Sequence, residues 1–218
     1  MRMVLLFSLF IYLINANIIQ NEDCFQIDEN NTIIETTTLT MKGNGKMCDC
    51  KINELKEYRN LITKIIFDDK VTSIGESCFI SFSQLKTIYF GKGVTKIKQY
   101  AFYNTVLENL IIPNTIKVIE SHTFEDNTQL VSIQFEDGNN ELQIEENAFK
   151  NCEKLTTIYI PKRLKQFDQK IFDNCNNIKE ITIAKDHENY QVKDNIVYSI
   201  DVTKIIYYCY CNFLTYYV

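Results

Sequence analysis

Few residues of this chain have the type and spacing that catalysis requires. The histidines, His122 and His187, have no serine or cysteine at a recognisable motif spacing, and we expect both to lie on the surface. Glu145-Glu146 falls in a polar turn rather than a cleft, and Gly91-Lys92-Gly93 is typical of a turn and lacks the phosphate-loop pattern. The sequence therefore predicts no catalytic residue, no cofactor-binding residue and no cofactor.

Cysteines offer a second kind of chemistry, since the chain has 8 of them. Cys48-Asp49-Cys50 suggests either a metal or redox site or a structural disulfide. No second pair with zinc-type spacing stands nearby, so we favour a disulfide and predict no metal site. The expected pairing joins Cys24 to Cys48 or to Cys50 and leaves one thiol over.

The first residues of the chain resemble a secretory signal. Arg2 is followed by an apolar run from Val4 to Ile14, interrupted by Ser8, and Ala16 is a suitable cleavage position. The alternative, an uncleaved membrane anchor, is less favoured because the run is short for a span. We expect a secreted or cell-surface protein whose formal net charge changes from −5 to −6 when Arg2 is removed. Such an acidic protein is a poor binder of nucleic acid.

These residues are positioned by a phrase that repeats about every 23 residues. Each copy has an apolar residue, a phenylalanine five positions later, and apolar residues six and three positions further on, except that the second copy has one residue fewer between Phe102 and Leu107. A fixed period of this length indicates a repeat solenoid, in which each coil packs on its neighbours, rather than a compact single-core domain. The copies are Ile74, Phe79, Leu85, Ile88; Ile97, Phe102, Leu107, Leu110; Ile119, Phe124, Leu130, Ile133; Ile144, Phe149, Leu155, Ile158; and Phe167, Phe172, Ile178, Ile181.

Each coil contains a short strand followed by a turn. Residues 85–90, 157–160 and 180–183 alternate between apolar and polar as half-buried strands do, and the same spacing places the first coil near Ile62. The phenylalanine segments are too short for a full helix, so we expect irregular or 3₁₀ geometry there and buried structural rings. The fold class is thus mainly β, with parallel strands stacked along the solenoid.

The repeat resembles the BspA-type class of leucine-rich repeats. Its pattern is matched most clearly by Leu155-Thr-Thr-Ile158-Tyr-Ile160-Pro161 and by Ala148-Phe149-Lys-Asn-Cys152. A second instance is Ala101-Phe102 with Leu110-Ile-Ile112-Pro113. The resemblance covers about residues 60 to 183. It departs from the pattern at the second unit, which lacks one residue before Leu107, and at the third, which is enlarged around Gly138.

The resemblance and the pattern together divide the chain into four parts. Residues 1–16 are the signal peptide, 17–60 a leader and cap, 61–183 the solenoid, and 184–218 a closing segment with a hairpin around the polar turn Ser199–Thr203 and an apolar tail. The tail either covers the end of the array or leaves an apolar edge for self-association. Asn30 begins the only glycosylation sequon.

Core positions of the repeat also account for three cysteines. Cys78, Cys152 and Cys175 fall on such positions, and Cys152 and Cys175, 23 residues apart, stack in adjacent coils. Stacked side chains point the same way, which is poor geometry for a bridge, so buried thiols are favoured over a disulfide.

Alternation along each strand predicts which side chains face a partner. One outward position per strand forms a row that mixes aromatic, aliphatic and polar groups, a composition suited to recognition. The competing interpretation is that strands simply favour such residues. The candidate partner-binding row is Ile66, Tyr89, Ile111, Gln134, Tyr159 and Thr182.

Resemblance to BspA-type proteins implies adhesion to an extracellular protein or cell-surface ligand. The alternative is an extracellular structural component that self-associates through its C-terminal tail and has no specific ligand. An enzyme is the class that the sequence favours least.

Overall fold

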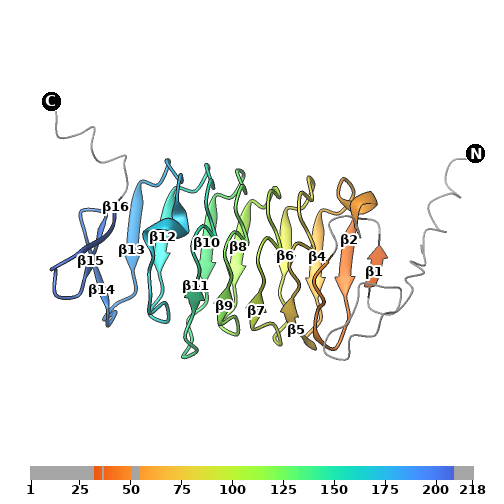
Figure 1. Cartoon of the computed structure of the whole chain (residues 1–218), viewed down its shortest axis with the longest axis horizontal. Coiled ribbons are helices and arrows are strands. Elements are labelled where there is room, and N and C mark those ends of the chain that lie inside the picture. Colours follow the sequence, from red (N-terminus) through yellow and green to blue (C-terminus); the bar gives the residue numbers. More distant parts are fainter. Residues whose placement is uncertain (1–31, 36, 51–54, 209–218) are drawn as a thin grey trace, which may run out of the picture.

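The computed structural model describes residues 32–35, 37–50 and 55–208, and it is an elongated β-solenoid (Figure 1). The predicted fold class is confirmed: short strands are stacked in coils, and helix in the described residues is limited to two 3₁₀ segments, η1 (Lys56–Tyr58) and η2 (Gln169–Phe172). The signal peptide, Asn30, Cys24 and the apolar tail from Cys209 lie outside the described residues.

One long side of the solenoid carries the main strand of each coil, and we call its outer surface the strand face (Figure 1). Its strands fall into three separate sheets. The first has the order β1-β2-β4-β6, with β1 antiparallel and the rest parallel; the second pairs β8 with β10, and the third β12 with β13, both in parallel. The strands are β1 (Thr32–Glu35), β2 (Thr38–Met41), β4 (Lys64–Phe67), β6 (Thr87–Tyr89), β8 (Asn109–Ile112), β10 (Ser132–Phe135), β12 (Thr157–Ile160) and β13 (Glu180–Ile183).

The other side, which we call the second face, is a single parallel sheet of order β11-β9-β7-β5-β3. Four of its strands each carry one buried isoleucine of the repeat, Ile74, Ile97, Ile119 and Ile144, and an isolated parallel bridge between Leu142 and Leu164 extends the pairing by one more coil. They are β3 (Gly45–Lys46), β5 (Val71–Ile74), β7 (Lys96–Ile97), β9 (Val118–Ile119) and β11 (Gln143–Ile144).

A column of phenylalanine rings fills the interior between the two faces. The predicted core positions are confirmed, since all five rings are at most 3% exposed. Successive rings stack nearly parallel, with centroids 5.2 to 5.5 Å apart. Each coil thus buries its apolar residues only by contact with its neighbours, as the repeat pattern requires. The rings belong to Phe79, Phe102, Phe124, Phe149 and Phe172.

Turns beside these rings depend on residues in the left-handed region, which the sequence analysis does not identify. Asp126, Asn151 and Asn174 have φ values near +60°, a conformation that Asn and Asp tolerate better than most residues. Their side chains also connect coils: Asn151 Nδ2 donates to Asp126 Oδ1 at 2.6 Å, and Asn174 Nδ2 donates to Asn151 Oδ1 at 3.1 Å.

Parallel pairing begins one coil before the position near Ile62 that the repeat indicates. Leu39 pairs with Ile65, 26 residues on, and both side chains are fully buried. This coil carries no phenylalanine phrase and has a different length, so the 23-residue pattern does not reveal it.

The disulfide prediction needs a correction. Cys50 is bonded to Cys78, with Cα atoms 4.8 Å apart, which excludes the pairing of Cys50 with Cys24 and shows that Cys78 is not a free core thiol. Cys48 also forms a disulfide, and its pairing with Cys24 stays a prediction. Cys152 and Cys175 are free and buried, as predicted.

Beyond β13, a three-stranded antiparallel sheet of β14 (Tyr190–Lys193), β15 (Ile196–Ser199) and β16 (Ile205–Tyr208) packs on the end of the array, and its β15–β16 hairpin confirms the one predicted. Side chains take the place of a further coil here. Asn195 Oδ1 accepts the N–H of Ile181 and its Nδ2 donates to Lys179 O, while Tyr190 Oη accepts the N–H of Phe167.

His187 belongs to this closing segment, and its predicted place on the surface is wrong. The side chain is 5% exposed. Its Nδ1 accepts the N–H groups of Asn189 and Tyr190, so the neutral ring carries its proton on Nε2 and donates it to Leu164 O at 3.2 Å. The charged neighbours in sequence conceal this structural role.

Candidate functional site

The predicted partner-binding row lies on the outer surface of the strand face. Tyr89 and Ile111 are 54% and 50% exposed, and Gln134 and Thr182 are also exposed. Ile66 and Tyr159 are half-buried. Register places Ile66 beside Tyr89, Ile111 beside Gln134 and Tyr159 beside Thr182. Whether these residues bind a partner stays a prediction.

The row is not carried by one continuous sheet, because the strand face is interrupted twice. Paired neighbours such as Ile65 and Ile88 are 23 residues apart. The first interruption falls between Ile88 of β6 and Leu110 of β8, which are 22 residues apart, and the second between β10 and β12, which are offset by 25 residues. The irregular units that the sequence reveals therefore coincide with breaks in the strand face.

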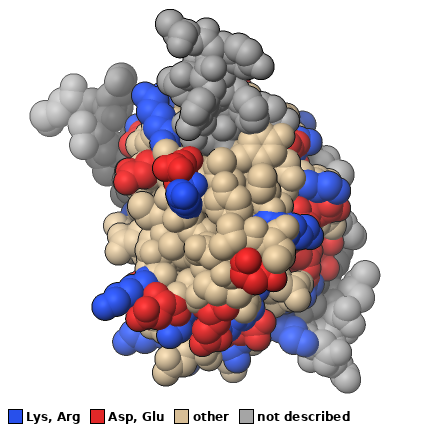
Figure 2. Space-filling model, turned by 90° about the vertical axis from the view of Figure 1, so that its left-hand side faces the viewer, with Lys and Arg blue, Asp and Glu red and all other residues tan. Residues whose placement is uncertain are grey.

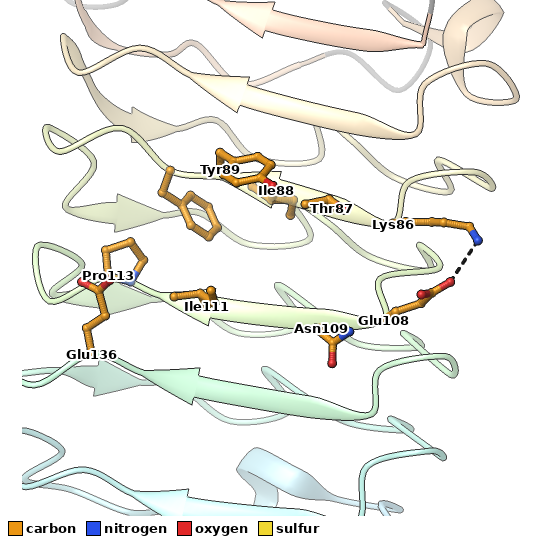
Figure 3. Close-up of a pocket in the computed structure, with 10 residues that line it drawn as sticks. Lys86, Thr87, Ile88, Tyr89, Glu108, Asn109, Ile111, Pro113 and Glu136 are labelled. Carbon is orange, nitrogen blue, oxygen red and sulfur yellow. Dashed lines mark ion pairs between the residues drawn. The ribbon is translucent and has the colours of Figure 1, made fainter.

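At the first break lies an open groove of about 450 Å³ (Figure 3). Tyr89 and Ile111, the two exposed large hydrophobic members of the row, lie on either side of it, and its wall includes the half-buried Phe90. Pro113 and Glu136 line one end, and Lys86 and Glu108 the other. The sequence identifies the shortened unit but not the groove, because a missing residue does not by itself show which face opens.

Charges lie at the ends of the groove rather than at its centre. Lys86 Nζ and Glu108 Oε1 form an exposed ion pair of 3.0 Å, drawn as a dashed line in Figure 3. Lys64 Nζ lies 5.2 Å from the centre of the Tyr89 ring, in range of a cation–π contact. At the opposite end the exposed Glu136 pairs with no cationic side chain in the described residues; its Oε2 accepts the N–H of Asn114 at 3.3 Å. The apolar centre thus lies between a neutralised pair and an acidic end.

Arg163 supports the acidic end from inside the solenoid, and sequence reasoning misses it. The side chain is 3% exposed and donates to three backbone carbonyls, those of Pro113, Ile116 and Glu136, at 2.7 to 3.1 Å. Burial lowers the pKa of Arg163, while the carboxylates of Glu136 and Asp137 act in the opposite direction. The guanidinium therefore fixes the turns that carry Pro113 and Glu136, two residues of the groove.

Other chemistry-bearing residues are engaged in structure. His122 stacks on Tyr100, with ring centroids 4.9 Å apart, and its Nδ1 contacts Glu125 Oε2, so it is half-buried rather than on the open surface as expected. Contact with Cys175 and burial raise the pKa of the Cys152 thiol, which disfavours the reactive thiolate.

The described residues contain no cluster of three or more His, Cys, Asp or Glu side chains arranged to hold a metal ion. No helix in the same residues is long and apolar enough to cross a membrane. The groove is accordingly the concave feature of the strand face on which a binding hypothesis rests.

Solved structures with the same fold include a vaccine antigen and a leucine-rich cell surface protein. The pneumococcal vaccine antigen PcpA aligns with a TM-score of 0.63 at 20% identity over 83% of this chain and 55% of its own. A leucine-rich cell surface protein from Faecalibacterium prausnitzii gives 0.50 at 22% identity over 77% and 56%. A leucine-rich repeat protein from Eubacterium ventriosum gives 0.59 at 21% identity over 79% and 46%. This chain spans about half the length of these proteins, and the likeness shows the fold alone.

Sequence comparisons assign the family. No curated protein matches the chain. A family model of the BspA type leucine rich repeat region matches in 6 copies, over residues 56–179 and 95–218. Those spans cover most of the chain and include the coils on both sides of the groove. The chain therefore belongs to the BspA-type leucine-rich repeat family.

Proposed function

We propose that this chain is a non-enzymatic binding module that acts outside the cell and holds a protein partner on its strand face. Residues 1–16 would direct its export, and adhesion to a protein or to another cell would be the outcome. The observation that carries the proposal is the exposure of Tyr89 and Ile111 beside the groove. Family membership and the surface proteins that share the fold support it.

The energetics of recognition favour this surface. Exposed tyrosine offers a large contact area at a small cost in conformational entropy, and it is enriched at binding sites. Tyr89 and Ile111 project from strands held by the solenoid, so little ordering is needed when a partner binds. Polar groups nearby, including Ser132 Oγ bonded to Asn109 Oδ1 at 2.7 Å, form a rim of satisfied hydrogen bonds.

The test is a pair of double variants in the full chain. Tyr89→Ala with Tyr159→Ala removes the aromatic groups of the row, and Thr72→Ala with Gln143→Ala alters two exposed residues of the second face. Partners recovered from extracellular-matrix and cell-surface fractions would be purified and titrated by interferometry. We expect the first variant to lose at least about tenfold in affinity and the second to bind as wild type. If the first variant binds its partner as tightly as wild type, the strand face is refuted as the site.

A second candidate, self-association in an extracellular layer, is favoured by the end of the array at β14–β16. Figure 2 views this end and shows uncharged side chains over most of its centre, with charged ones mainly toward the rim. The hairpin there exposes three aliphatic residues, Ile200, Val202 and Ile205, to between 52% and 58%. Exposed apolar groups of this kind mark contact sites.

Sizing chromatography across a range of concentrations tests this candidate. Self-association predicts oligomers that dissociate when Val202 and Ile205 are changed to Lys, and also when residues 209–218 are removed. A monomer at all concentrations, with wild-type thermal stability in the lysine variant, would leave the binding module as the better account.

A further inference from the structure

We propose that the groove between β6 and β8 binds an extended segment of the partner protein, and that the segment pairs with the groove through its main chain. This inference rests on the proposed function of the strand face and deepens it. It also specifies the segment's chemistry: an apolar residue next to a lysine or arginine.

The first support comes from the backbone at the break. In a parallel ladder the peptide groups of successive residues face opposite sides of the strand. Thr87 N–H donates to Thr63 O of the preceding coil, so the peptide groups of Ile88 face the opposite way, toward β8. Ile112 O accepts from Glu136 N–H, which follows β10, so the peptide groups of Ile112 face β10. By the same alternation, the peptide groups of Asn109 and Ile111 face β6.

These two edges face each other without a ladder between them, because β6 and β8 belong to separate sheets. Within each sheet of the strand face such groups are paired with the next coil, and only the break between β10 and β12 shares this lack of a ladder in the described coils. Backbone groups away from water gain free energy from a hydrogen-bonding partner, and an extended peptide supplies donors and acceptors at the matching spacing. The gap has only to widen for a strand to enter, since no ladder has to be broken.

The second support comes from side chains. Tyr89 and Ile111 lie on opposite sides of the groove, so an apolar residue of the incoming segment contacts both. At one end Glu136 forms no ion pair with any residue that the structure describes, while at the other Glu108 is already paired with Lys86. A basic residue therefore gains most at the Glu136 end, which sets the order of residues in the bound segment.

Arg163 contributes to this selectivity indirectly. It holds the carbonyls of Glu136 and Pro113 from the buried side, so the acidic end of the groove keeps its position before a ligand arrives. A preorganised site loses less conformational entropy on binding.

A displayed library of random dodecapeptides, selected on the full wild-type chain, is the probe. We expect the enriched peptides to share an apolar residue beside Lys or Arg. One such peptide, made synthetically, should bind at least about tenfold more weakly to Ile111→Arg and measurably more weakly to Glu136→Gln, and equally well to Tyr159→Ala. Circular dichroism and thermal unfolding establish that each variant is folded.

Main-chain pairing has its own readout in amide hydrogen exchange. Bound peptide should slow exchange of the Ile88, Asn109 and Ile111 amides by about tenfold or more. N-methylation of either alternating set of peptide amides should weaken binding, because one set faces β6 and the other faces β8. Peptides that bind Ile111→Arg as well as wild type, binding unaffected by either methylation pattern, or failure to select any peptide would each overturn the inference.

The outcomes also separate this inference from the proposed function. Partners that bind the strand face but respond to Tyr159→Ala rather than to Ile111→Arg refute the groove and leave the face as the site. Partners that respond to neither variant refute both.

Discussion

The two faces of the solenoid respond differently to the same irregularities. On the second face, Ile97 pairs with Ile119 across 22 residues, and Ile119 with Ile144 across 25. On the strand face, the same two offsets separate the sheets. A ladder of two residues needs few aligned pairs, whereas a ladder of three or four requires the coils to approach evenly along its length. The second face thus stays one continuous sheet when the coil length varies, whereas the strand face divides into separate sheets.

A groove can therefore open on the strand face where one unit of the repeat is shorter than the others. The groove lies at the shortened unit, while the continuous second sheet holds the coils together behind it. Under the proposed function, recognition falls on the strand face and stability on the continuous sheet behind it, a division that experiments can break.

Removing a ring shared by both faces should have the largest effect. Phe124→Ala deletes a fully buried side chain stacked between two others, and we expect a loss of about 3–5 kcal/mol in the free energy of unfolding. Urea unfolding measures it, with Tyr89→Ala as the exposed control, expected to change stability by about 0.5 kcal/mol or less. Similar costs for the two variants would contradict a single core beneath both faces.

Next comes Arg163, which links the turns between the faces. Arg163→Met leaves three backbone carbonyls, one buried and two partly buried, without their donor, and we expect a loss of about 3 kcal/mol. The exposed neighbour Lys162→Met is the matched control and should be nearly neutral. A stable Arg163→Met variant would show that the methionine packs well and that the three hydrogen bonds of Arg163 are dispensable.

The disulfide should matter mainly at the N-terminal end of the second face. Replacing Cys50 and Cys78 with serine releases a bridge between residues 28 positions apart, at an expected cost of about 2–4 kcal/mol. Hydrogen exchange should quicken at β5 more than at β11. Uniform change along the sheet would argue against a local role.

A smaller effect should follow from acidification at the other end. Burial lowers the pKa of His187, so the folded chain keeps the ring neutral while the unfolded chain takes up a proton as the pH falls through about 6.5. Unfolded chains then bind more protons, so stability declines from that pH downward until the folded pKa is reached. Unfolding curves from pH 7.5 to 5 should show this decline in wild type and a weaker one in His187→Gln; equal slopes would contradict it.

The finest test compares single amides in the unliganded chain. Ile111 N–H faces the break and should exchange about tenfold faster than Leu110 N–H, which faces β10. Inserting one residue between Asn104 and Thr105 restores the 23-residue offset and should slow Ile111. Equal rates in wild type would mean that the break is closed in solution.

Much of this architecture can be predicted from the sequence, because repeated positions constrain one another. Phe124 and Phe149 occupy the same place in successive coils, so the core follows from the period, and the outward row follows from alternation along the strands. The family is likewise evident in the segments Leu155–Pro161 and Ala148–Cys152, whose patterns recur at fixed spacing.

Features outside the period could not be predicted. Cys50 and Cys78 meet across 28 residues, which does not match the 23-residue period. His187 lies between Asp186 and Glu188, and Arg163 follows Lys162, so only the stacking of turns shows that both side chains are buried. The groove depends on how a shortened coil approaches its neighbour, which is a property of three-dimensional packing.

The side-chain hydrogen bonds between the closing sheet and the last coils have a mechanical consequence. Asn195 and Tyr190 bond to the backbone of coils that precede them, so they act as a latch on the last parallel strands. If tension were applied from the C-terminal side, this latch would bear load before any coil peeled away. Its strength would then set the force at which the solenoid begins to unwind, one coil after another.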